Sequence, residues 1–118
     1  MGKLTLAAVL LLAVAPVRAD VTTVLADRLE QLSENPEPYE CWHLTWILAQ
    51  LPCVLDQLAD EQGWDGATLG QWLADLTDVG AHSALALWFG PQWFDAAFVR
   101  RRLQIAREAL EEGRCSSS

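Results

Sequence analysis

Apolar residues recur at the spacing of an amphipathic helix in the stretch WDGATLGQWLADLTDVG, residues 64–80, and this pattern constrains the fold more than any other feature of the chain. Positions i, i+3, i+4 and i+7 of one helix face are all apolar: Leu69, Trp72, Leu73 and Leu76. Asp65 precedes this run, and an aspartate there can accept a hydrogen bond from the free amides of a first helical turn. We therefore expect a helix that begins after Asp65 and ends at Gly80.

Similar helical patterns, rich in Leu, Ala, Glu and Gln, fill the rest of the chain after residue 20, and Val, Ile and Thr never alternate over the length of a strand. Proline and glycine divide these patterns, so we expect helices over residues 21–34, 36–51, 53–62, 66–79, 81–89 and 91–112. Asp20 should cap the first helix and Asn35 the second, with Pro36 in its first turn. We expect an all-α fold, a compact bundle of five to six short helices after a cleaved signal peptide.

The helix expected over residues 36–51 is apolar nearly all round, because its polar residues His43 and Gln50 share one narrow strip. Such a helix is usually the central one of a bundle. We therefore expect it to be buried among the others.

The first 19 residues have the three parts of a secretory signal peptide. They are the basic start MGK, the uncharged 14-residue run LTLAAVLLLAVAPV, and the small residues Val17 and Ala19 before a cut that leaves Asp20 as the first residue. The run is shorter than the roughly 20 apolar residues of a membrane span. We expect a signal peptide at 1–19, a helical domain at 20–113 and a mobile polar tail at 114–118. The protein should be secreted or periplasmic, with no stable membrane anchor after cleavage. The alternative is that the segment stays uncleaved as an anchor.

The charge of the chain after residue 19 is strongly negative, with 16 acidic residues against six arginines, or −10. Thirteen of the acids and a single arginine, Arg28, precede residue 100, whereas residues 100–118 hold five arginines and three glutamates. An acidic body repels phosphate backbones, so we expect no nucleic-acid partner.

The chain has three cysteines, Cys41, Cys53 and Cys115. A helix between the first two would separate them by about 18 Å at 1.5 Å per residue, whereas a disulfide needs Cα atoms within roughly 4.4–6.8 Å. We therefore expect that Cys41 and Cys53 are not bonded to each other. In an oxidising compartment three alternatives stay open: either of them bonds Cys115 and leaves one thiol, Cys115 bonds another chain, or all three remain reduced. The spacing fits no zinc motif, and we expect no metal and no other cofactor.

Four aromatic residues surround one turn, in the stretch LWFGPQWF: Trp88, Phe89, Trp93 and Phe94. They either pack in the core or form an aromatic surface for a partner or an apolar ligand.

The arginines near the C-terminus are the only basic feature, and Arg100 and Arg107, seven residues apart, share a helix face. Guanidinium groups bind anions and carboxylates, which makes this pair a candidate anion site; the alternative is pairing with acidic residues of the same chain. The two histidines, His43 and His82, stand in no catalytic or metal-binding pattern. We therefore assign no catalytic residue.

These features favour a small secreted acidic helical protein that acts by binding another protein or a second copy, with a covalent link through Cys115 as one form of it. The alternative is a carrier that holds an apolar molecule in a Trp-lined pocket. A small periplasmic enzyme acting on an anion is least favoured. An interaction protein should expose Trp88 or Trp93 and contain no cavity. A carrier should enclose an apolar pocket of a few hundred Å³. An enzyme should gather an arginine, a carboxylate and a histidine in one cleft.

Overall fold

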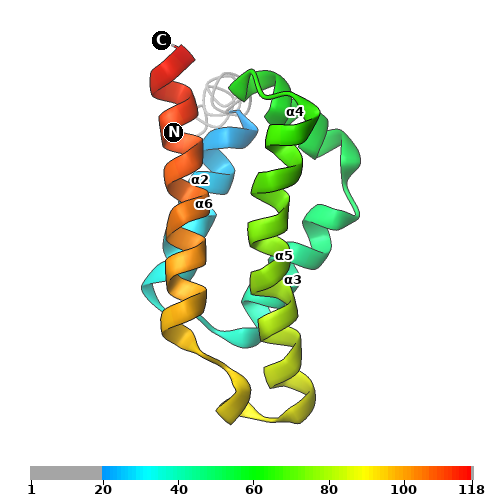
Figure 1. Cartoon of the computed structure of the whole chain (residues 1–118), viewed down its shortest axis with the longest axis vertical. Helices are drawn as coiled ribbons and strands as arrows, with labels where there is room; N and C mark the ends of the chain where they lie inside the picture. The colour runs from blue at the N-terminus through cyan, green and yellow to red at the C-terminus, as the bar shows by residue number, and fades with distance from the viewer. Residues whose placement is uncertain (1–19, 118) are drawn as a thin grey trace, which may run out of the picture.

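A computed structural model describes the backbone of residues 20–117 and the side chains of residues 20–112. This part of the chain is all-helical, which confirms the expected fold class (Figure 1). Its elements are α2 (Val21–Glu34), α3 (Pro38–Ala49), α4 (Pro52–Gln62), α5 (Gly66–Phe89), the 3-10 turn η1 (Pro91–Trp93) and α6 (Ala96–Ser117). The predicted signal peptide, residues 1–19, lies outside the described residues. No helix in residues 20–117 is long and apolar enough to cross a membrane.

Side-chain caps fix where the helices begin. Asp20 Oδ1 accepts from the Thr23 amide at 2.7 Å, and Asp65 Oδ1 accepts from the Thr68 amide at 2.8 Å, as expected. The expected cap at Asn35 is wrong. Glu37 caps α3 through the amide of Glu40, so α3 starts at Pro38 and Asn35 ends α2.

The expected helix end at Gly80 is also wrong, because α5 continues without a break to Phe89. Gly80 is buried, and a Cβ atom at this position would collide with the side chain of Thr45 on α3. The glycine therefore lets two helices approach closely. Gly63, in contrast, ends α4 as expected, in a left-handed conformation with φ of 71° that suits glycine.

The last helix also differs from its expected bounds. Pro91 opens η1, and α6 begins only at Ala96, where Asp95 accepts from the Phe98 amide at 3.1 Å. At its other end α6 runs past Gly113 to Ser117, since one glycine costs a helix only about 0.5–1 kcal/mol relative to alanine. The mobility of residues 114–118 stays a prediction, and the side chain of Cys115 lies outside those described.

The two long helices, α5 and α6, form an antiparallel hairpin, and each carries a shorter helix on its flank (Figure 1). α3 packs against α5, and α2 packs against α6. α4 lies at the end of the bundle where α2 begins, opposite the turn between α5 and α6 (Figure 1). The fully buried core side chains come from every α-helix: Leu29, Leu32, Cys41, Leu58, Leu76, Val79, Val99, Leu103 and Leu110.

α3 is not the central helix that its composition predicts. Only Cys41 and Leu48 on it are buried, while Tyr39 and Trp46 are about half exposed. The helix packs chiefly against one neighbour, α5, so most of its circumference faces outward.

Candidate binding surfaces

The turn between α5 and α6 presents three aromatic side chains to solvent. Trp88 is 82% exposed, Phe89 60% and Trp93 51%, and we call these three residues the aromatic tip. Phe94 is half-buried and packs against the core. The predicted aromatic group is thus divided, with three rings outside and one inside.

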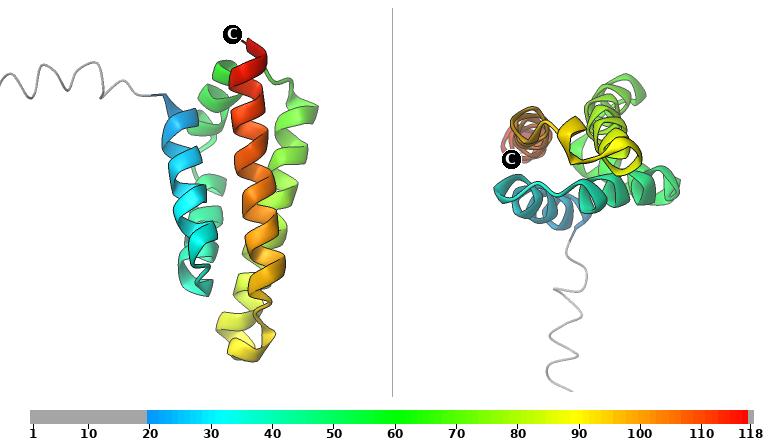
Figure 2. Two further views of the ribbon diagram at one scale, coloured as in Figure 1. Left: turned by 90° about the vertical axis from the view of Figure 1, so that its left-hand side faces the viewer. Right: turned by 90° about the horizontal axis from the view of Figure 1, so that it is seen from below.

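The backbone of the turn explains why these rings face outward. Gly90 has φ of 119°, which side chains rarely allow, and it reverses the chain directly after α5. The side-chain amide of Gln92 donates to the carbonyl of Phe89 at 3.3 Å, across this reversal. Buried residues of α5 end at Ala86, and the turn projects beyond α2 and α3 (Figure 2, left). The last turn of α5 therefore lies beyond α2 and α3, and its rings Trp88 and Phe89 stay exposed.

The aromatic tip lies in an uncharged stretch. Residues 79–94 contain no Asp, Glu, Lys or Arg, and the exposed leucines Leu85 and Leu87 belong to the same stretch. The nearest charged residues along the chain are Asp78 and Asp95. Several large exposed apolar side chains in one uncharged segment are typical of interaction sites.

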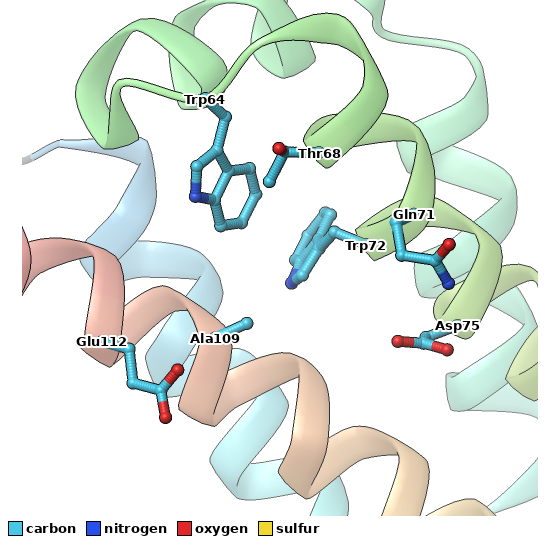
Figure 3. A pocket seen from close by; sticks show the side chains of 7 residues that line it. All are labelled: Trp64, Thr68, Gln71, Trp72, Asp75, Ala109 and Glu112. Carbon is cyan, nitrogen blue, oxygen red and sulfur yellow. The ribbon is translucent and has the colours of Figure 1, made fainter.

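A second surface is a hollow of about 350 Å³ between α5 and α6, which we call the Trp64–Trp72 hollow (Figure 3). Its lining is aromatic, polar and acidic: Trp64, Thr68, Gln71, Trp72, Asp75, Ala109 and Glu112. The Trp72 indole N–H donates to the Ala106 carbonyl at 3.0 Å, which fixes this ring in the core. The Trp64 ring lies against it with centroids 5.8 Å apart, and remains partly exposed.

A third surface is an open groove of about 310 Å³ between α3 and α5. Trp42 and Trp46 stack with ring centroids 6.1 Å apart and form one wall, and small residues of α5 line the opposite side: Gly80, Ala81 and Ala84. Gly80, where α3 and α5 approach closely, is one of the lining residues.

The candidate anion-binding residues Arg100 and Arg107 each have a partner within the chain. Arg100 Nε donates to the backbone carbonyl of Ser33 at 3.0 Å, and Arg107 Nη1 pairs with Glu111 Oε2 at 2.8 Å. The two arginines therefore have different partners, and Arg107 Nε is buried without a hydrogen-bond partner among the described residues. Arg102 likewise pairs with Asp75 at 3.0 Å on α5.

The histidines and cysteines also lie apart in separate environments. The His43 ring stacks on Tyr39, whereas the His82 ring lies against Phe98 at 4.7 Å. Cys41 is buried, and its burial raises the pKa of the thiol, while Cys53 is exposed at the start of α4. They are not bonded to each other, as expected. Within residues 20–112 no three His, Cys, Asp or Glu side chains are grouped to hold a metal ion.

Two of these surfaces escape sequence reasoning. Trp72 belongs to the apolar stripe and is therefore predicted to be a core residue, which is correct for most of its ring. No pattern in the neighbouring sequence indicates the hollow beside it. The groove on α3 is missed because an apolar helix is expected to be buried.

The chain was compared with protein-family models, curated proteins and solved structures, and it matches none of them.

Proposed function

We propose that this protein acts by binding another protein through its aromatic tip. The observation that carries the proposal is the exposure of Trp88, Phe89 and Trp93 at the projecting end of the α5–α6 hairpin. Burying apolar surface stabilises a fold or a complex by roughly 25 cal/mol per Å². The three rings of the aromatic tip are largely unburied in the folded chain. A partner that covers the rings gains this stabilisation.

The chemistry of the surroundings describes the partner. Aromatic side chains are enriched in the centres of interfaces, where charged residues are depleted, and residues 79–94 have this composition. The partner should therefore offer an apolar groove to the aromatic tip. Beyond the tip the chain is strongly acidic, so a basic rim around that groove would favour association and orient it.

Site-specific photo-crosslinking tests this proposal. Trp88→p-benzoylphenylalanine places a reactive group at the tip, and Val24→p-benzoylphenylalanine, at a position 57% exposed on α2, serves as the control. In cells that produce the protein, we expect a discrete crosslinked product from position 88 that is absent from position 24. The partner identified from this product, once purified, should bind the wild-type protein. The substitution Trp88→Ala should weaken this binding at least tenfold.

Two results would contradict the proposal. One is a crosslinking pattern that is the same at positions 88 and 24. The other is binding of the purified partner that Trp88→Ala and Trp93→Ala leave unchanged. A crosslinked product of twice the chain mass would identify a second copy as the partner.

Export and a covalent link are part of the same proposal. The signal peptide would direct the domain to an oxidising compartment, and cleavage after Ala19 would release it there. Oxidation in that compartment would then join the Cys115 thiol by a disulfide to a cysteine of the partner that the aromatic tip has bound. A carrier function is the alternative, and the Trp64–Trp72 hollow favours it, because this hollow has the volume of a small-molecule site.

A further inference from the structure

The Trp64–Trp72 hollow combines two features that recognise organic cations, and it is independent of the aromatic tip. The first feature is its pair of indole rings, tilted by 50° to each other. Trp72 is only 4% exposed and is held by its bond to Ala106, so it supports Trp64 in one orientation. Aromatic faces carry partial negative charge and attract ammonium groups, tryptophan most strongly.

The second feature is the carboxylate on each side of the hollow. Asp75 stands on α5 and Glu112 on α6, with the indole rings between the two helices (Figure 3). Asp75 shares its charge with Arg102, at 3.0 Å. Glu112 is exposed and makes no ion pair with any side chain of residues 20–112.

The surrounding charge favours the same class of ligand. None of the lining residues is basic, and the chain after residue 19 carries a formal charge of −10. An anion would face two carboxylates. A metal ion would find no group of three converging ligands in this part of the chain.

We infer that the Trp64–Trp72 hollow binds a small organic ammonium ion. Its positive head lies against the Trp64 ring on the side of Glu112, the lining carboxylate that has no described ion pair, and its short chain or hydroxyl group contacts Thr68. A volume of about 350 Å³ accommodates a molecule of this size and leaves the positive head partly hydrated.

A comparison of choline with its uncharged isostere 3,3-dimethylbutan-1-ol tests the inference. Titrations of the ¹⁵N-labelled chain, followed through the tryptophan indole N–H signals, give both affinities. We expect choline to shift the Trp64 signal and to bind at least tenfold more tightly than the isostere. Raising the salt concentration should weaken choline binding, because a charge attraction contributes to it.

Matched substitutions locate the site. Trp64→Leu keeps an apolar side chain but removes the aromatic face, and should weaken choline binding at least fivefold. Glu112→Gln should weaken it about threefold. Trp93→Leu, at the aromatic tip, makes the same chemical change elsewhere and should leave binding unchanged.

Three outcomes would overturn the inference. Equal affinity for choline and its isostere would make the hollow a general apolar site. Unchanged binding in Trp64→Leu, with its fold verified by circular dichroism, would place the ligand elsewhere. No shift of the Trp64 signal at 50 mM choline would show that the site does not exist.

Discussion

Glu61 connects two elements that are far apart in the sequence. Its carboxylate accepts from the backbone amides of Val21 at 3.1 Å and Thr22 at 2.9 Å, and from the Thr22 hydroxyl at 2.9 Å. Burial acts to raise the pKa of Glu61, but the hydrogen bonds outweigh it and the pKa lies below 4.5. A negative charge at the first turn of α2 also suits the helix dipole.

Because the folded state lowers the pKa of Glu61, this carboxylate stabilises the protein above the ordinary glutamate pKa, about 4.5. The contribution is lost as the pH falls through the lowered pKa. We predict that Glu61→Gln reduces the free energy of unfolding by about 1 kcal/mol at pH 7. Urea denaturation at pH 7 and at pH 3 should show the difference between variant and wild type shrinking at the lower pH. Glu108→Gln, at an exposed site, is the control, and an equal loss at both pH values would refute the argument.

Two glycines of α5 allow a second prediction at the scale of single residues. Gly80→Ala places a methyl group against Thr45, and overpacking of this kind costs about 1–3 kcal/mol, of which better helix propensity offsets about 1 kcal/mol. At Gly70 the space is open, so Gly70→Ala should stabilise by about 0.5–1 kcal/mol. Thermal unfolding of both variants checks the opposite signs. A stabilising Gly80→Ala would mean that the two helices are farther apart than described.

At the scale of elements, the sequence predicts helix type better than helix limits. The caps at Asp20 and Asp65 and the stop at Gly63 were predictable, because each depends on residues within one turn. The continuation through Gly80 depends on Thr45, 35 residues away, which no local pattern contains. The exposure of α3 and of the aromatic tip was not predictable either, since composition cannot distinguish a core face from a partner-binding face.

The start of α6 sets the position of the aromatic tip, and Asp95 defines that start. We predict that Asp95→Ala destabilises the protein by about 1 kcal/mol, because the Phe98 amide loses its acceptor. Asp95→Ser restores an acceptor and should recover most of the loss. Hydrogen exchange should rise in the first turn of α6 in the alanine variant only. Uniform exchange changes along the chain would argue against a local cap.

At the scale of the whole molecule, the first measurement is the intact mass of the exported protein, before and after reduction. We predict a chain that begins at Asp20. A doubled mass that halves on reduction supports a covalent partnership through Cys115, and one internal disulfide instead supports a self-contained domain. A chain that retains residues 1–19 would contradict the predicted cleavage. Cys41 and Cys53 are not bonded to each other in the structure, so an internal disulfide would join one of them to Cys115.

The bonding of the first turn of α2 has a practical consequence for protein engineering. The four leading amides of the helix, from Val21 to Val24, all have acceptors supplied by Asp20 and Glu61. Because the first four amides of α2 already have hydrogen-bond acceptors within the domain, they need none from the preceding chain. Carrier proteins or affinity tags joined ahead of Asp20 should therefore be interchangeable, and the domain should melt at the same temperature behind each of them.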